Sequence, residues 1–142
     1  MTDFEATHGE YTISTDPDKL NADAIYAYLS QSYWAAGRSR DVVIKSLKHS
    51  LNFGLYHDER QIGLVRVITD YATFAYLCDV YVLEAHRKQG LSKWLMRCVK
   101  EHPDLQNIRR WLLVTRDAHG LYAQFGFTPL DGSARWMAIV KP

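Results

Sequence analysis

The sequence predicts one domain of the α+β class, arranged in three layers, in which a mixed sheet of about six or seven strands carries helices on both faces. The length of 142 residues suits a single core, and 47% apolar with 23% charged residues is ordinary globular composition. One near-continuous apolar stretch, Phe74 to Leu83, is typical of a central strand covered on both faces. We therefore expect residues 1–142 to fold as a single domain around that strand.

Two helices are expected after a short first strand at Tyr11 to Thr15. Asp18 can cap a helix over Lys19 to Ala36, which Gly37 ends, and Ser39 can cap the second helix. Each helix has an apolar stripe at helical spacing, formed by Leu20, Ala24, Ile25, Tyr28 and Leu29 in the first and by Val43, Ile44, Leu47 and Leu51 in the second.

The middle of the chain predicts neighbouring strands and then a helix. Phe53 to Tyr56 and Ile62 to Ile68 flank a polar loop, which indicates a hairpin, and Phe74–Leu83 follows after a second turn. Beyond a basic turn, a helix that Pro103 ends has one apolar side, formed by Leu91, Trp94, Leu95, Cys98 and Val99.

The last third of the chain predicts one parallel strand, a short helix and a closing hairpin. Trp111 to Thr115 should run parallel to Phe74–Leu83, because a strand, helix, strand succession favours a right-handed crossover. Asp117 can cap a helix over Ala118 to Phe125. Two further strands, Phe127 to Leu130 and Arg135 to Val140, are expected to pair as a hairpin.

Charge and composition exclude several classes of protein. The net charge of +1 provides no global field for nucleic acid or an anionic membrane, so no such partner is expected. The N-terminus lacks the apolar run of a signal peptide, and no apolar run approaches the roughly 20 residues of a membrane span. Cys78 and Cys98 are expected as buried thiols, and the scattered histidines have no zinc-ligand spacing, so no metal is expected. The predicted location is the cytoplasm.

The turn from Arg87 to Ser92, between the central strand and the next helix, has the features of an anion-binding site. Unpaired N–H groups and the positive end of the helix dipole meet there, beside the charges of Arg87 and Lys88. The chain has neither a P-loop string nor the three glycines of a dinucleotide-binding fingerprint. A tight connection with solvated charges remains the simpler alternative.

A second motif, Asp117 to Phe127, is a short helix that carries Tyr122 one turn before a Gly-Phe step. Considered alone, Tyr122 is better explained as a packed core aromatic, which is the commoner fate of a helical tyrosine. In this order, however, the two motifs resemble those of the GNAT superfamily of acyl-CoA-dependent N-acetyltransferases. Arg87–Ser92 is similar to the family's Arg/Gln-x-x-Gly-x-Gly/Ala signature, and Leu121–Phe127 to its Tyr-x-x-x-Gly-Phe segment. Ser92 departs from the usual small Gly or Ala.

The resemblance implies a largely antiparallel sheet and a site for acetyl-CoA. In this family the strand before the signature carries a bulge and splays from the following parallel strand, here Leu77–Leu83 and Trp111–Thr115. Pantetheine would lie in that gap. The residues implied to bind the cofactor are Tyr81, Val82, Arg87, Lys88, Gln89, Gly90, Leu91 and Ser92.

The implied chemistry is acetyl transfer to a primary amine by direct attack in a ternary complex. Tyr122 matches the family's general acid, and the backbone N–H near Val82 would polarise the thioester carbonyl. Asp79 is the leading candidate for the base, because a carboxylate in an apolar strand must be paired, hydrogen-bonded or neutralised; a purely structural role is the alternative. Lesser candidates are Asp70, Tyr76, His119 and a chain of waters. A covalent role for Cys78 is disfavoured by its charged neighbour.

The acceptor is expected beside Tyr33, Trp34 and Arg38, where aromatics and an arginine could grip a carboxylate, although the aromatics could equally cap the core. The sequence does not distinguish a small amine from a peptide amine. A homodimer is possible. The rival from another class is an acyl-CoA-binding sensor without turnover.

Overall fold

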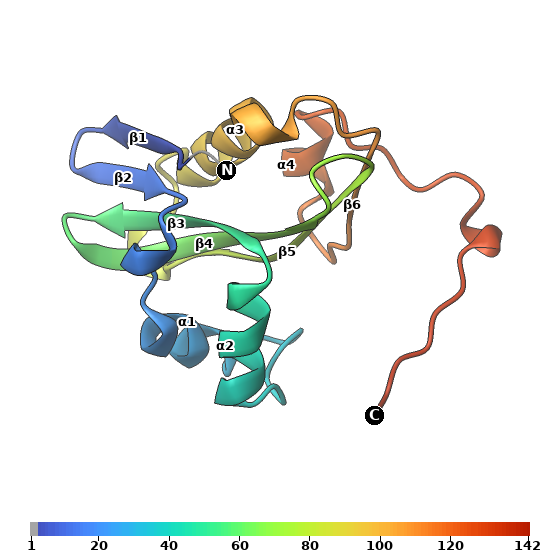
Figure 1. Cartoon of the computed structure of the whole chain (residues 1–142), viewed down its shortest axis with the longest axis horizontal. Helices are drawn as coiled ribbons and strands as arrows, with labels where there is room; N and C mark the ends of the chain where they lie inside the picture. Colours follow the sequence, from blue (N-terminus) through green and yellow to red (C-terminus); the bar gives the residue numbers. More distant parts are fainter. Residues whose placement is uncertain (1–2) are drawn as a thin grey trace.

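The computed structural model describes residues 3–142, which form one six-stranded sheet with the strands in sequence order (Figure 1). The strands are β1 (Glu5–His8), β2 (Tyr11–Ser14), β3 (Leu51–His57), β4 (Arg60–Thr69), β5 (Phe74–Val82) and β6 (Arg110–Leu113). Neighbouring strands are antiparallel except β5 and β6, which are parallel. The predicted mixed sheet and its parallel pair are therefore confirmed.

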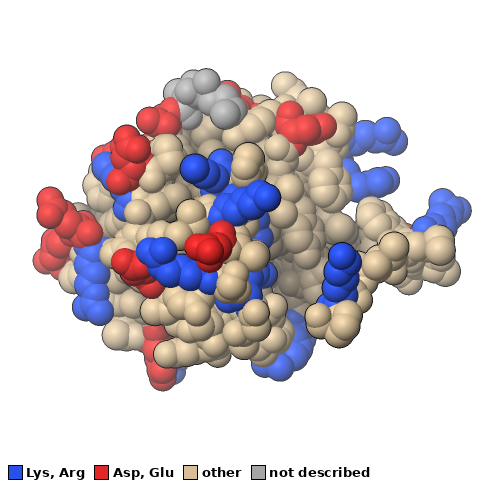
Figure 2. Space-filling model, turned by 60° about the horizontal axis from the view of Figure 1, so that its bottom comes forward, with Lys and Arg blue, Asp and Glu red and all other residues tan. Residues whose placement is uncertain are grey.

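Helices cover both faces of this sheet, which confirms the predicted three layers (Figure 1). On one face lie α1 (Ala22–Leu29) and α2 (Arg40–Lys48), and on the other α3 (Leu91–Glu101) and α4 (His119–Ala123). Both acidic and basic side chains lie on the α1 and α2 side (Figure 2). Within residues 3–142, no helix has the length and apolarity that crossing a membrane requires.

Two apolar clusters hold the layers together. The larger one joins the α3 and α4 face to the sheet through buried residues such as Leu77, Val82, Leu95 and Tyr122. The smaller one places α1 and α2 against β4 and β5, with Tyr81 among its members. Burying apolar surface on both sides of the same strands contributes about 25 cal/mol per Å², so the central strands are the most strongly held part of the sheet.

Local hydrogen bonding explains where the first helices begin and end. Asn21, not Asp18, caps α1, with its side chain accepting from the Ala24 N–H at 3.0 Å. The predicted helix to Ala36 is wrong beyond Leu29. There the hydroxyls of Ser30 and Ser32 donate to carbonyls three residues earlier, and such local bonds compete with helix continuation. Ser39 caps α2 as predicted, accepting from the Val42 N–H.

Two differences from the expected order of strands lie at the ends of the chain. Strand β1 was not anticipated, and it pairs with the predicted strand at Tyr11 through a tight turn at Gly9. The predicted closing hairpin, 127–130 with 135–140, is wrong for this structure, because neither segment is a strand. The chain instead runs away from the body after residue 131, through a short 3-10 turn at Ser133–Arg135 (Figure 1). Within residues 3–142 the sheet has six strands, which agrees with the predicted six or seven.

Gly63 is a sharp test of the packing between β4 and β5. A Cβ at this position would lie 2.8 Å from the Tyr81 carbonyl oxygen, which is backbone and cannot move aside cheaply. We expect Gly63→Ala to lower the free energy of unfolding by about 1–3 kcal/mol, as overpacking does. Urea denaturation measures this change. Gly37→Ala is the matched control, because nothing lies within 4 Å of its Cβ position; an equal loss in both variants would contradict the explanation.

Candidate active site

A β-bulge in β5 sets the geometry of the site. Leu64 pairs with Tyr81 and Arg66 with Cys78, so β5 has one residue more than β4 between those pairs. Asp79 lies in this extra stretch with a φ of 54°, a left-handed conformation that Asp tolerates better than most residues. Because side chains alternate along a strand, one additional residue reverses the faces of everything after it.

The reversal is visible in the packing of β5. Before the bulge, Ala75 and Leu77 pack into the α3 and α4 cluster. After the bulge, Tyr81 packs with α1 and α2. In a regular strand Tyr81 would lie on the same face as Ala75 and Leu77, because it is an even number of residues from both. Asp79 thereby turns toward the α1 and α2 side, where it is 4% exposed. The bulge that the family resemblance implied is present.

The same bulge coincides with the end of pairing between β5 and β6. The last paired residues are Leu77 and Leu113, where β6 ends. β5 continues to Val82, and among residues 3–142 no strand pairs with residues 78–82 on the edge facing away from β4. The two parallel strands therefore separate over the stretch that contains Tyr81 and Val82, which were predicted to face pantetheine.

The turn into α3 presents free amides. Gly90 is the N-cap residue of α3, has a φ of 78°, and no side chain caps the first turn. Lys88 also has a positive φ, 67°, and exposed non-glycine residues in this conformation are uncommon. Successive N–H groups in such a turn form a concave anion site, supported by the helix dipole. Leu91 anchors the turn in the core, and Ser92 is half-buried in the first turn.

Arg87 and Gln89 fix this turn to the rest of the domain. The Arg87 Nε donates to the Val82 carbonyl at 2.8 Å, and its Nη2 lies 3.3 Å from the Tyr28 hydroxyl. Gln89 Nε2 donates to the His86 carbonyl and to the Tyr11 hydroxyl. Arg87 therefore joins the end of β5 to the turn, and the exposed Lys88 side chain is available to meet an anion.

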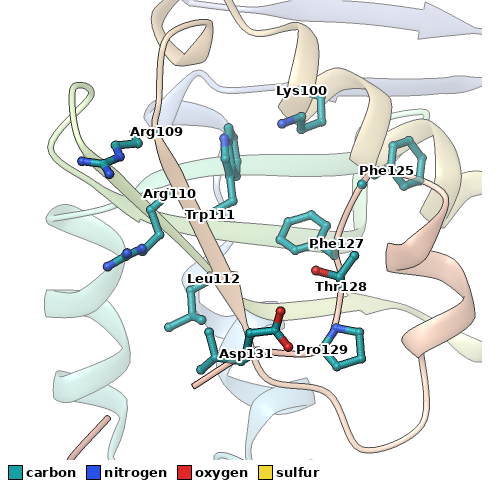
Figure 3. Close-up of a pocket in the computed structure, with 12 residues that line it drawn as sticks. Lys100, Arg109, Arg110, Trp111, Leu112, Phe125, Phe127, Thr128, Pro129 and Asp131 are labelled. Carbon is teal, nitrogen blue, oxygen red and sulfur yellow. The ribbon is translucent and has the colours of Figure 1, made fainter. Parts of the chain in front are cut away.

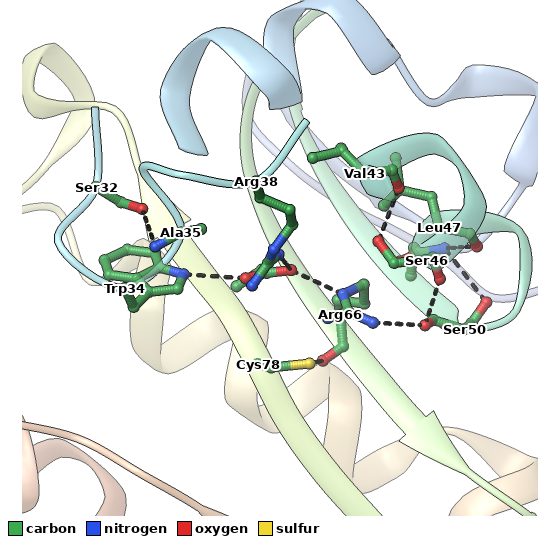
Figure 4. Close-up of polar contacts among 12 residues, drawn as sticks. Ser32, Trp34, Ala35, Arg38, Val43, Ser46, Leu47, Ser50, Arg66 and Cys78 are labelled. Atoms are coloured by element: carbon green, nitrogen blue, oxygen red, sulfur yellow. Dashed lines mark hydrogen bonds and ion pairs between the residues drawn. The ribbon is translucent and has the colours of Figure 1, made fainter. Parts of the chain in front are cut away.

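Asp79 is the centre of a buried polar network with Trp34, Arg38 and Arg66, the three partners labelled in Figure 4. Its Oδ1 accepts from Trp34 Nε1 at 2.9 Å, and its Oδ2 accepts from Arg38 Nη1 at 2.9 Å and from Arg66 Nε at 2.8 Å. Arg66 in turn donates to Ser50 Oγ at 3.0 Å. Trp34 and Arg38 come from the turns that follow α1, so this network holds that loop against β5.

The arginines determine the charge of the carboxyl group. Burial by itself raises the pKa of Asp79, but the hydrogen bond and charge of Arg66, followed by Arg38 and Trp34, outweigh it and hold that pKa below its ordinary value. Asp79 is therefore an ionised carboxylate with both oxygens engaged. A group in that state is a weak proton acceptor.

Tyr122 lies on α4 and is 8% exposed, with its ring edge against Phe127. Burial raises the pKa of the Tyr122 phenol, and the nearby Tyr33 raises it further. The Arg116 guanidinium lies 3.9 Å from the centre of the Tyr33 ring, so it connects the loop after α1 to the chain just beyond β6. The predicted acceptor residues and the predicted acid are thus brought to the same end of β5.

The other candidates for proton chemistry have different surroundings. Burial raises the pKa of Cys78 to about 11, which leaves it protonated and unreactive. The Asp70 carboxylate accepts hydrogen bonds from Thr73 and from backbone N–H groups of the β4–β5 turn, and these bonds keep its pKa low. Burial raises the pKa of Tyr76. His119 is exposed on α4.

Sequence reasoning missed three residues of the site. Arg66 and Arg116 are described above, and Tyr28 stacks on Tyr81 with ring centres 3.9 Å apart. Arg66 could have been found, because an arginine inside the apolar stretch 62–68 needs a buried partner, and Asp79 is the acidic residue of the next strand. Tyr28 and Arg116 carry no local signal.

Known proteins resemble this chain over most of its length. The family model described as the acetyltransferase (GNAT) family matches residues 12–127. A protein of Gibberella zeae, named as a candidate acetyltransferase, is 35% identical over 139 residues, covering 83% of this chain and 78% of the relative. The crystal structure of a candidate GNAT-family acetyltransferase from Xanthomonas campestris is 47% identical, with a TM-score of 0.90 and coverage of 96% and 95%. A Staphylococcus aureus structure with 24% identity shares the fold, with a TM-score of 0.75 and coverage of 92% and 99%.

The mixed sheet, the separated parallel strands and the uncapped turn before α3 are the features that the resemblance to acetyltransferases implied. The chain belongs to the GNAT acetyltransferase family. Membership implies use of an acyl-CoA and an acceptor substrate.

The Asp79 network can be tested through stability. Asp79→Asn leaves two partly buried arginines without their counter-charge, and removing one partner of a buried ion pair costs about 3–5 kcal/mol. We expect a loss of that size in the free energy of unfolding at neutral pH, measured by urea denaturation. Asp23→Asn is the control: its ion pair with Arg40 is exposed, and such pairs contribute about 0–1 kcal/mol.

The difference in the free energy of unfolding between the wild type and Asp79→Asn should change with pH in one definite direction. The folded-state pKa of Asp79 lies below the unfolded value of about 3.9, so its contribution is fully present above that value and is lost as pH falls through the lower, folded pKa. The stability gap between the wild type and Asp79→Asn should stay constant from about pH 8 to 5 and narrow only below about pH 4. A gap that grows on acidification would contradict the assignment.

Proposed function

We propose that this protein transfers an acetyl group from acetyl-CoA to a primary amine by direct attack in a ternary complex. The observation that carries the proposal is the stretch of β5 between Asp79 and Val82, whose edge facing away from β4 has no partner strand within residues 3–142. It leads at one end into the uncapped turn at Gly90, and it shares a core cluster with Tyr122. An extended ligand with an anionic end and a reactive end suits such a stretch.

The residues present fit acetyl-CoA. The amides from Gln89 to Ser92 and the Lys88 side chain would hold the pyrophosphate, because backbone N–H groups at a helix start favour anions. The free backbone edge near Tyr81 and Val82 would pair with the amides of pantetheine. When bound, acetyl-CoA supplies an acyl group activated as a thioester.

Tyr122 is the general acid in this proposal. Its raised pKa keeps the phenol protonated at neutral pH, so it can give its proton to the thiolate that departs as the new C–N bond forms and the C–S bond breaks. The amine loses its own proton to solvent water. Tyr122 then recovers a proton from solvent, which balances the cycle.

Asp79 acts in this proposal as a positioning residue. Both of its oxygens accept hydrogen bonds and its pKa is low, which disfavours it as the base that takes the amine's proton. Its contacts with Trp34 and Arg38 fix the loop that follows α1. Removing the carboxylate would release that loop and would change the acceptor KM more than kcat.

The acceptor would lie beside Tyr33, between the loop after α1 and Tyr122. Arg38, one-quarter exposed by its side chain, and the exposed Arg116 provide positive charge there. This arrangement favours an amine that also carries a carboxylate or another anionic group, because guanidinium groups bind such groups in a bidentate manner.

An acyl-CoA sensor without turnover is the alternative, and one measurement separates the two functions. The protein is mixed with acetyl-CoA and a panel of small amines, amino acids and peptides, and free thiol is followed with time. Thiol release above the hydrolysis rate for any amine supports transfer. Acetyl-CoA binding without release across the panel would establish the sensor instead.

Tyr122→Phe tests the general acid. It removes one hydroxyl and keeps the ring packed against Phe127, so we expect kcat to fall by about 10²-fold or more while the Kd for CoA changes little. Tyr26→Phe on α1 is the matched control and should keep the wild-type rate. A Tyr122→Phe enzyme with unchanged kcat would remove this residue from the role.

Lys88→Ala tests the pyrophosphate site without disturbing the Arg87 contact with Val82. One charge-assisted contact at an exposed turn contributes about 1 kcal/mol, so CoA binding should weaken about three- to tenfold. Binding of a pantetheine fragment that lacks the nucleotide should not change. Lys45→Ala on α2 is the control, and equal losses for CoA and the fragment would contradict the assignment; calorimetry measures both.

A further inference from the structure

Arg116 carries an exposed positive charge that no carboxylate of the domain neutralises. It lies between β6 and α4, and among residues 3–142 no acidic group is within ion-pair distance of it. The neighbouring Asp117 is exposed and forms no ion pair with it in that part of the chain. What holds the Arg116 guanidinium is the ring of Tyr33, whose centre is 3.9 Å from it.

This contact leaves the hydrogen-bond donors of Arg116 available. A distance of 3.9 Å places the guanidinium carbon in van der Waals contact with the face of the Tyr33 ring. The five N–H donors of an arginine lie around the edge of its plane, and a contact with an aromatic face does not use them as a carboxylate would. An arginine held in this way is suited to bind a carboxylate in a bidentate manner.

Tyr33 is itself fixed at the reactive end of the site. Its ring packs edge to face on Trp34 at 5.1 Å, and Trp34 Nε1 donates to the buried Asp79 carboxylate. The proximity of Tyr33 also raises the pKa of the Tyr122 phenol, so the ring lies near the proposed general acid. The network of Asp79 therefore determines where Arg116 is held.

Arg38, the other arginine on this side, is committed to the fold. Its Nη1 donates to Asp79 Oδ2 at 2.9 Å, and Arg66 Nε donates to the same oxygen at 2.8 Å. Turning Arg38 toward a ligand would break an ion pair whose carboxylate is 1% exposed, and separating buried charges is costly. Arg116 has no such pair to break.

The balance of charge distinguishes between classes of acceptor. Even when Asp117 is counted with Asp79, three guanidinium groups outnumber two carboxylates around this end of the site. Positive surroundings repel a polyamine and lower the pKa of a bound ammonium group, which favours the neutral amine that attacks. A protein N-terminus has a neutral amide next to its amine, whereas a free amino acid has a carboxylate there.

We infer that Arg116 binds the carboxylate of the acceptor, that Tyr33 is the positioning residue that holds Arg116, and that the acceptor is a free amino acid and not a protein amine or a polyamine. The inference rests on the proposed function, because it names the acceptor class for the same site. It separates the two arginines: Arg116 recognises the ligand, and Arg38 maintains the loop.

The first experiment compares matched acceptors. Genetically encoded amino acids, their amides, short peptides with the same first residue and spermidine are each mixed with saturating acetyl-CoA, and free thiol is followed. The best amino acid should exceed its amide in kcat/KM by about 10- to 100-fold, as expected for a charge-assisted bidentate contact. Equal kcat/KM for acid and amide, or a better peptide or spermidine, would overturn the inference.

The second experiment uses variants of Arg116. Arg116→Gln should reduce the acid-over-amide ratio by about tenfold or more, chiefly through the KM of the acid, and the intrinsic reactivities of the two substrates cancel in this comparison. Arg116→Lys should keep part of the ratio, because it keeps the charge and loses the planar fork. A wild-type ratio in Arg116→Gln would contradict the assignment.

Arg109 is the matched control for Arg116. Arg109 and Arg110 lie at the start of β6, beside an open groove of about 460 Å³ between β6 and residues 125–131 (Figure 3). Arg110 pairs with Phe74 at the beginning of β5, so this arginine pair is at the opposite end of β6 from Arg116. Arg109→Gln removes one exposed guanidinium and should keep the wild-type ratio.

Tyr33 is tested by a pair of variants. Tyr33→Phe keeps the aromatic face and should keep the ratio, whereas Tyr33→Leu removes that face and should lower the ratio at least about threefold, with kcat for the amide little changed. Tyr33 is 59% exposed, so neither change threatens the core. A Tyr33→Leu enzyme with the wild-type ratio, or an equal loss for acid and amide, would remove Tyr33 from this role.

A binding measurement separates this inference from the proposed function. Calorimetric titration of the same amino acids and amides into protein saturated with CoA needs no turnover. The Kd of the preferred acid should be about tenfold or more below that of its amide, and Arg116→Gln should abolish the difference. Absence of thiol release with every amine would refute the transferase, while equal Kd values for acid and amide would refute the role of Arg116.

Discussion

The ion pair between Asp79 and the two arginines is the interaction on which the site depends. A carboxylate inside an apolar sheet is unfavourable unless its charge is compensated, and Arg66 and Arg38 provide that compensation from two different elements. Because Arg66 belongs to β4 and Arg38 to the loop after α1, the pair fixes three parts of the chain relative to one another. The bulge at Asp79 is what allows the carboxylate to face them.

The bulge has a second consequence for the sheet. It reverses the faces of β5 and coincides with the point where β5 and β6 separate, so the strand edge near Val82 becomes free. Gly63 permits this geometry, since a side chain there would collide with the Tyr81 carbonyl. Strain at Asp79 is thus supported by its polar partners and by a glycine on the neighbouring strand, as expected where function requires an irregular strand.

The open groove beside β6 lies along a sheet edge that has no partner strand within residues 3–142. In most sheets an exposed apolar edge invites aggregation, and proteins protect such edges by charge, by covering or by pairing. Here the apolar residues from Trp136 to Val140 of the same sequence are exposed to solvent and leave that edge uncovered.

The sequence by itself determined the class of fold, the order of most elements and the family. Those features depend on local patterns: the apolar stretch of β5, the cap at Ser39, Gly90 before α3 and the Tyr122 segment. It could not determine the pairing of Asp79 with Arg66, the inward contact of Arg87 with Val82, or the path of residues 135–140. Each of these depends on which residues distant in the sequence meet in the folded chain. The sequence predicted a strand over the last segment, and the structure has none there. Whether a strand forms depends on an available partner edge, and only the tertiary structure revealed that the turn at Ser133–Arg135 leads this segment away from β6.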